Sequence, residues 1–116
     1  GVELIAGALR DPVFGPVVMF GLGGTLVEVT DDVVFRVAPL TIKDATDMLE
    51  GIKGNILLEK FRGNEVVGKG QLNDLLLSLS EIMLSFERID EIEVNPLFLT
   101  EKGPIAVDAR IKLSRP

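Results

Sequence analysis

The most informative segment of the sequence is residues 91–111, which read EIEVNPLFLTEKGPIAVDARI. Polar and apolar side chains alternate in its first part, as they do in a strand with one buried face. A turn signal follows at residues 101–103, and residues 104–111 are the expected partner strand. We therefore predict an antiparallel hairpin whose first strand covers residues 89–100.

The polar side of this hairpin is a candidate metal site. If residues 101–102 form a two-residue turn, Asn95 lies opposite Asp108 and Glu93 lies opposite Arg110. Opposed Cβ atoms in such pairs are roughly 5 Å apart, and Mg²⁺ takes hard oxygen ligands together with waters and substrate phosphates. Glu93, Asn95 and Asp108 with a bound triphosphate would meet that description.

Two other interpretations of these side chains stay open. They fit the solvent face of an ordinary sheet, and Glu93 with Arg110 would also make a surface ion pair of little energetic value. Two details favour a site. Asn is disfavoured within strands, and Pro96 cannot donate to a ladder, which indicates an edge or an irregularity beside Asn95.

The rest of the sequence predicts strands first and helices second. An antiparallel meander is expected from four apolar runs, residues 2–9, 16–20, 25–29 and 33–38. Thr41 and Asp44 predict a capping box, with helical spacing up to a stop at Gly54. Residues 55–60 are compatible with a short helix, and residues 72–86 with a longer one. The core stripe of that helix is predicted to be Leu72, Leu75, Leu76, Leu79, Met83 and Phe86. This order indicates an α+β domain with an antiparallel sheet and flanking helices.

A second candidate for ligand contact is the loop Gly21-Leu22-Gly23-Gly24. Common phosphate-binding glycine loops run from a strand into a helix, whereas this one leads into strand-like residues. It is therefore predicted to be a hairpin loop with glycines at positive φ, or a loop whose backbone N–H groups line a ligand. Arg62-Gly63 is either a phosphate clamp or an ordinary loop segment.

Composition excludes several classes of function. A chain of 116 residues is enough for one domain. The net charge is −6 and the cations are scattered, so we expect no nucleic-acid partner. No run reaches the ~20 apolar residues of a membrane span, and no secretory signal begins the chain, so we expect a cytoplasmic protein without a membrane partner. Cys and His are both absent, which removes thiol and imidazole chemistry from this chain.

Five motifs in order resemble the ATP-grasp region of ADP-forming acetyl-CoA (acyl-CoA) synthetases and, more distantly, the succinyl-CoA synthetase β subunit. The motifs are residues 3–16 continuing through Gly21-Leu22-Gly23-Gly24 to Glu28, then Ala38-Pro39-Leu40, Phe61-Arg62-Gly63, and residues 91–97 and 106–111. The resemblance covers nearly the whole chain. It implies that residues 1–116 are the C-terminal half of an ATP-grasp domain whose N-terminal half lies outside this chain.

The resemblance also implies a reaction and a set of ligands. Enzymes of this family interconvert acyl-CoA, ADP and phosphate with a free acid, CoA and ATP. A phosphohistidine on a CoA-binding domain or α subunit carries the phosphoryl group. The implied cofactors are Mg²⁺ and ATP or ADP, with Asn95 and Asp108 as metal ligands and Glu93 beside them. Gly23, Gly24 and Arg110 are implied contacts of the nucleotide or its phosphates.

Two other functions fit the same resemblance. A related class of proteins fuses this region to an acetyltransferase domain and uses it as a sensing module. The third interpretation is a structural domain that only contacts another subunit. Retention of Glu93, Asn95 and Asp108 together argues against the structural domain. The ligase and the sensing module share this region, so it does not separate them, and we take the ligase as the prediction. The isolated piece is expected to be inactive, and its open sheet face is expected to promote self-association.

Overall fold

The computed structural model describes residues 2–24, 32–53 and 65–115 of the chain. Three sequence-based expectations lie outside these ranges. They are the strand at residues 25–29, the short helix at residues 55–60 and the loop at Arg62-Gly63.

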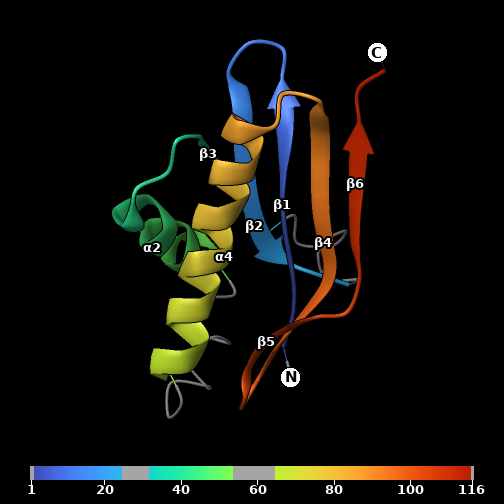
Figure 1. Ribbon diagram of the computed structural model, residues 1–116. Helices are drawn as coiled ribbons and strands as arrows, with labels where there is room; N and C mark the ends of the chain where they lie inside the picture. The colour runs from blue at the N-terminus through green and yellow to red at the C-terminus, as the bar shows by residue number, and fades with distance from the viewer. Residues whose placement is uncertain (1, 25–31, 54–64, 116) are drawn as a thin grey trace.

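Within the described residues, six strands form one antiparallel sheet in the order β3-β2-β1-β4-β5, and β6 also pairs with β4. The strands are β1 (Val2–Asp11), β2 (Gly15–Leu22), β3 (Val33–Val37), β4 (Ile89–Thr100), β5 (Gly103–Ala106) and β6 (Ala109–Leu113). The described helices, α2 (Ile42–Gly51) and α4 (Glu65–Ser85), pack side by side on one face of this sheet (Figure 1). The predicted α+β class, with an antiparallel sheet and flanking helices, is confirmed.

The core lies between the sheet and the two helices. Alternate residues of β1, namely Leu4, Ala6 and Ala8, are buried against α4 because side chains alternate along a strand. Four residues of the predicted α4 stripe are fully buried, Leu72, Leu76, Leu79 and Met83. Leu75 is half-buried, and the prediction was wrong for Phe86, which is 59% exposed. The helix ends at Ser85, so Phe86 no longer follows the helical stripe toward the core.

The start of α2 and the end of α4 were predicted to within one residue, whereas the start of α4 was not. The Thr41 side chain accepts a hydrogen bond from the Asp44 N–H, and the Asp44 carboxylate accepts one from the Thr41 N–H, so the capping box of α2 is confirmed. Helix α4 begins at Glu65, seven residues before the expected start, and contains Gly68 and Gly70. Each interior glycine costs about 1 kcal/mol, which tertiary packing can outweigh. No described helix is both long and apolar enough to cross a membrane.

The last hairpin has the predicted register. Thr100 pairs with Gly103, which confirms a two-residue turn, and Glu93 pairs with Arg110. The single partner strand expected at residues 104–111 is instead divided into β5 and β6, because residues 107 and 108 leave the regular ladder.

An irregularity in β4 lies beside Asn95, as expected. The pairing of β1 with β4 shifts by one residue between Leu4 and Ala6. As a result, β4 buries Ile92 and Val94 on the helix side before the shift, and Leu97 and Leu99 on that same side after it. The buried positions of β4 are therefore even-numbered before residues 95–96 and odd-numbered after them.

Candidate metal site

Glu93 is the centre of a polar network on the sheet face that the helices leave open. Its Oε2 accepts a hydrogen bond from Nη2 of Arg110 at 2.6 Å, within an ion pair. Its Oε1 accepts one from Nδ2 of Asn95 at 3.2 Å. The Glu93 side chain is only 21% exposed, whereas that of Arg110 is 78% exposed. The ion pair between Glu93 and Arg110, which was the alternative interpretation of these side chains, is therefore present. A hydrogen bond also connects Glu93 to Asn95.

These contacts fix the charge state of the network. The hydrogen bond from Arg110, followed by that from Asn95, lowers the pKa of the Glu93 carboxyl below its ordinary value. The same bond raises the pKa of Arg110, and the nearby charge of Asp108 adds to this. Glu93 is thus an anion held by a permanent cation, and Asp108 lies close enough to influence the same guanidinium.

Asn95 and Asp108 face each other across the hairpin. The backbone N–H of Asn95 donates to the carbonyl oxygen of Asp108 at 3.1 Å, and the N–H of Val107 donates to the carbonyl oxygen of Pro96 at 3.0 Å. Asn95 and Asp108 are both exposed. The Asp108 Oδ1 atom accepts the N–H of Ala109 at 2.9 Å, so the first residue of β6 orients the carboxylate.

The donor set of this pair fits Mg²⁺. The Asn95 amide oxygen and the Asp108 carboxylate are hard oxygen donors of the kind that Mg²⁺ selects. Within the described ranges, no group of three or more His, Cys, Asp or Glu side chains is placed to hold a metal. A cation here would therefore complete its shell with water and ligand phosphates, as Mg²⁺ commonly does with nucleotides.

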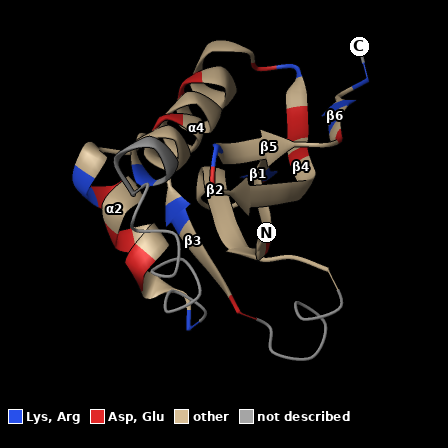
Figure 2. Ribbon diagram, turned by 90° about the horizontal axis from the view of Figure 1, so that it is seen from below, with Lys and Arg blue, Asp and Glu red and all other residues tan. Residues whose placement is uncertain are grey.

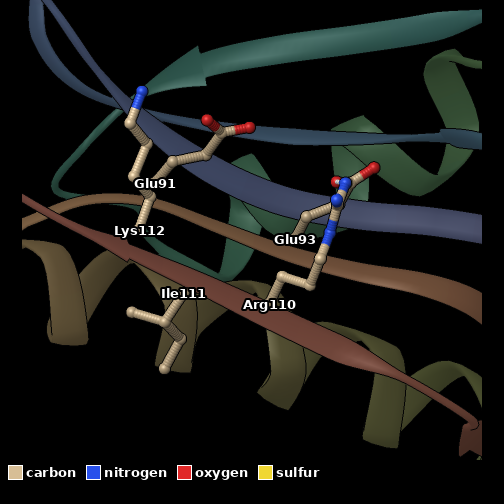
Figure 3. Close-up of a pocket in the computed structure, with 5 residues that line it drawn as sticks. All are labelled: Glu91, Glu93, Arg110, Ile111 and Lys112. Atoms are coloured by element: carbon tan, nitrogen blue, oxygen red, sulfur yellow. Dashed lines mark hydrogen bonds and ion pairs between the residues drawn. The ribbon is translucent and has the colours of Figure 1, made fainter.

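An open pocket of about 290 Å³ lies beside this network, lined by Glu91, Glu93, Arg110, Ile111 and Lys112. In Figure 3, Glu91 and Lys112 point to the same side of the strands as Glu93 and Arg110, while Ile111 points to the opposite side. Figure 2 shows acidic positions on β4 next to basic positions on β6. The pocket thus presents both acidic and basic side chains to a ligand on the same face of the sheet.

The predicted glycine contacts lie elsewhere on the sheet. The loop expected at residues 21–24 is confirmed only in part, since Gly21 and Leu22 belong to β2 and only Gly24 among its glycines has a positive φ, 67°. An added Cβ at Gly24 would lie 3.0 Å from Oε2 of Glu3. The Gly23 N–H donates to the carbonyl oxygen of Glu3 at 2.9 Å, so it is not available to a phosphate. Strand β1 separates the end of β2 from β4. The structure therefore brings together Glu93, Asn95, Asp108 and Arg110, without a described contact to Gly23 or Gly24.

Gly7 is a site-supporting residue that the sequence analysis missed. It pairs with Glu93, and an added Cβ would lie 2.5 Å from the carbonyl oxygen of Ile92. A glycine inside a strand pattern is a signal of close backbone approach, and this signal was available in the sequence.

The chain belongs to the ATP-grasp domain family, whose model matches residues 1–113. Among its relatives, the β subunit of ADP-forming acetate–CoA ligase I of Pyrococcus furiosus is 48% identical over 113 residues, which are 97% of this chain and 49% of the relative. The ADP-forming acetate–CoA ligase II of Archaeoglobus fulgidus is 47% identical over 112 residues, 96% of this chain and 16% of the relative. The resemblance to ADP-forming acyl-CoA synthetases is thereby confirmed.

A solved structure gives the same result for the fold. Acetyl-coenzyme A synthetase 1 of Ca. Korarchaeum cryptofilum, in complex with coenzyme A and Mg-AMPPCP, matches with a TM-score of 0.88 and 50% identity. The match covers 97% of this chain and 53% of that one. The chain therefore spans about half the length of that synthetase chain and of the Pyrococcus β subunit.

Proposed function

We propose that this chain is the C-terminal half of the ATP-grasp domain of a cytoplasmic, ADP-forming acyl-CoA synthetase, and that it holds the Mg²⁺ end of the nucleotide site. The reaction interconverts acyl-CoA, ADP and phosphate with a free acid, CoA and ATP. The observation that carries the proposal is the cross-strand pairing of Asn95 with Asp108, with Glu93 two residues away on the same strand. This pairing lies in a chain whose relatives are ligases of that class.

In this proposal Asn95 and Asp108 are the metal ligands, and Glu93 lies beside them in the site. Bound there, Mg²⁺ would neutralise charge on the nucleotide phosphates. The chain's own residues supply oxygen ligands from β4 and from the segment between β5 and β6, and the hydrogen bond between Asn95 N–H and the Asp108 carbonyl oxygen holds these two segments together. Arg110 is placed to meet a phosphate. Gly23 and Gly24 are proposed as nucleotide contacts from the family resemblance alone, because an added Cβ at these glycines would meet Leu4 and Glu3 of this chain.

The remaining parts of the reaction are assigned to other segments. The sequence has no histidine, so the phosphoryl carrier would be a phosphohistidine on a CoA-binding domain or α subunit. The N-terminal half of the ATP-grasp domain would complete the nucleotide site. The Korarchaeum structure, described with its phosphohistidine segment pointing towards the nucleotide binding site, supports this division.

The test is Mg²⁺-dependent binding of ADP by the intact enzyme. We expect Asp108→Ala and Asn95→Ala each to raise the Mg²⁺ concentration needed for half-maximal binding by at least about tenfold, since each removes an oxygen ligand. Asp74→Ala is the matched control because Asp74 is exposed on α4, away from the site. Binding by Asp108→Ala equal to that of the wild type would exclude the metal assignment.

A further inference from the structure

We propose that Glu93 is a positioning residue, which sets the orientation of the Asn95 amide and is itself held by Arg110, instead of binding the metal directly. This inference rests on the proposed function and assigns separate roles within its site. It starts from the observation that both carboxylate oxygens of Glu93 are already engaged by donors of this chain, Arg110 on Oε2 and Asn95 on Oε1.

The chemistry of the contact determines which way the Asn95 amide points. An ionised carboxylate only accepts hydrogen bonds, so the atom that Asn95 presents to Glu93 must be its NH₂ group. The amide oxygen is thereby turned away from Glu93. That oxygen is the only Asn95 side-chain atom able to bind a hard cation, so the contact selects the amide orientation that a metal ligand needs.

Arg110 has a corresponding effect on Glu93. Its guanidinium approaches Oε2 at 2.6 Å, and Glu93 is the more buried partner of the ion pair. A charge-assisted hydrogen bond of this kind is about twice as strong as a neutral one. It keeps Glu93 charged and limits its rotamers. Without it, the carboxylate would be free to turn toward a nearby cation and release the Asn95 amide.

The backbone around Glu93 makes the arrangement rigid. Glu93 lies between Gly7 of β1 and Arg110 of β6, so β4 is paired on both sides at this position. Residues that orient metal ligands by hydrogen bonding typically change metal affinity about 10- to 100-fold when they are removed. The expected effect of losing Glu93 is therefore large, although Glu93 does not touch the metal.

Glu91 and Lys112 provide an internal control. They form the next acidic and basic pair on the same two strands, line the same pocket and point to the same side (Figure 3). Neither has a described hydrogen bond to Asn95. Substitutions there change the local charge as substitutions of Glu93 and Arg110 do, without affecting the Asn95 amide.

The experiment measures the Mg²⁺ concentration needed for half-maximal ADP binding in the intact enzyme, together with ADP affinity at saturating Mg²⁺. Glu93→Met is compared with Glu91→Met, and Arg110→Met with Lys112→Met. We expect Glu93→Met to raise the Mg²⁺ requirement about 10- to 100-fold over its control, and Arg110→Met to raise it relative to Lys112→Met. The double variant should be no worse than Glu93→Met, because both residues act through one contact.

A lower Mg²⁺ requirement in Arg110→Met than in Lys112→Met would overturn the inference. If Glu93 were a direct ligand, removing its competing cation would strengthen metal binding and lower the Mg²⁺ requirement. A loss of ADP affinity at saturating Mg²⁺ with an unchanged Mg²⁺ requirement would also contradict it, since Arg110 would then act only on phosphate. If Glu93→Met does not fold, Glu93→Gln replaces it, and its one remaining acceptor oxygen should give an intermediate effect.

Failure of the inference and failure of the proposed function give different results. If Asp108→Ala and Asn95→Ala bind Mg²⁺ and ADP normally, the metal site itself is excluded. If those two variants lose binding while Glu93→Met and Arg110→Met behave like their controls, the metal site stands and the positioning role is excluded.

Discussion

Arg10 and Ile89 are 79 residues apart in the sequence, and the Arg10 guanidinium donates to the Ile89 carbonyl oxygen from Nε at 3.2 Å and from Nη2 at 2.9 Å. The same Nη2 also donates to the carbonyl oxygens of Met83 and Phe86, at 3.1 and 3.2 Å. Helix α4 has no basic residue in its last turn. Arg10 therefore supplies the positive charge that the carbonyl end of a helix favours, and it connects β1, α4 and β4.

Replacing this side chain should weaken that junction. We expect Arg10→Met to lower the free energy of opening at the end of α4 by about 1.5–3 kcal/mol, since hydrogen bonds to a charged group are lost there. Amide hydrogen exchange in α4 and β4 of the intact protein measures this locally. Arg36→Met is the control, because its described hydrogen bond is to the neighbouring Phe35 carbonyl, and exchange in α4 should not change. Equal exchange in Arg10→Met and wild type would contradict the role of Arg10.

The close approach of β1 and β4 at Gly7 leads to a prediction about the candidate site. Gly7→Ala places a Cβ 2.5 Å from the Ile92 carbonyl oxygen, so one strand must move. We expect a destabilisation of about 1–3 kcal/mol and an increased Mg²⁺ requirement for ADP binding, because the neighbouring Glu93 moves with its strand. The measurements are thermal unfolding and the ADP-binding titration.

The same substitution at Gly70 should have the opposite effect on stability. Gly70 is exposed within α4, and an added Cβ meets nothing within 4 Å. Gly70→Ala should therefore stabilise the protein by about 0.5–1 kcal/mol without affecting Mg²⁺ binding. If Gly70→Ala destabilises the protein, or if Gly7→Ala does not, the close approach of β1 and β4 at Gly7 is not the cause of the effect.

Ser80 connects α4 to the segment before α2. Its Oγ accepts a hydrogen bond from the Leu40 N–H at 3.0 Å, and its side chain is 1% exposed. Ser80→Ala leaves that backbone N–H without its partner, so we expect a loss of about 1–3 kcal/mol. Exchange of the Leu40 amide should accelerate accordingly. Ser78→Ala, an exposed position on the same helix, should leave the Leu40 amide as protected as in wild type.

The capping box of α2 makes the stability of the protein depend on pH. The hydrogen bonds from the Thr41 backbone N–H and side chain lower the pKa of Asp44 below its ordinary value. A lowered carboxyl pKa in the folded state means that the contribution to stability is complete above the ordinary pKa, about 4. It is lost as the pH falls through the lower folded value.

Asp44→Asn removes the titrating group, so part of the decrease in melting temperature on acidification should disappear. Thr41→Ala should cost about 1 kcal/mol at neutral pH through loss of the cap. The measurement is the melting temperature of each variant from neutral to acidic pH. An unchanged acid dependence in Asp44→Asn would exclude the capping carboxylate as its source.

Local patterns predicted some features of this structure well. The alternation in residues 91–95 and the two-residue turn were sufficient to place Asn95 opposite Asp108 and Glu93 opposite Arg110. The capping box was predicted equally well, since its two residues lie only three positions apart in the sequence. Each of these features depends on the alternation of side chains along a strand or on contacts between residues a few positions apart.

The features that were missed depend on tertiary packing. The division of the last strand into β5 and β6 and the early start of α4 are not encoded by propensity alone. The contact of Arg10 with Ile89 joins residues far apart in the chain. The hydrogen bond between Asn95 and Glu93 was also unpredicted, because alternation places two side chains on one face without specifying which atoms meet.

The reversal at residues 95–96 of which β4 side chains are buried affects how this segment tolerates mutation. Odd-numbered residues Glu91 and Glu93 lie on the sheet face that carries the candidate site, while odd-numbered Leu97 and Leu99 are buried under the helices, because the irregularity at Asn95 reverses the facing of the strand. Deleting one residue there would remove the irregularity from the pairing with β1, but it would shift the pairing with β5 or β6 by one residue, because that pairing keeps one register from Glu91 to Thr100. The segment can therefore accept changes of side-chain chemistry much more readily than changes of length, and natural variation in it should be confined to substitution.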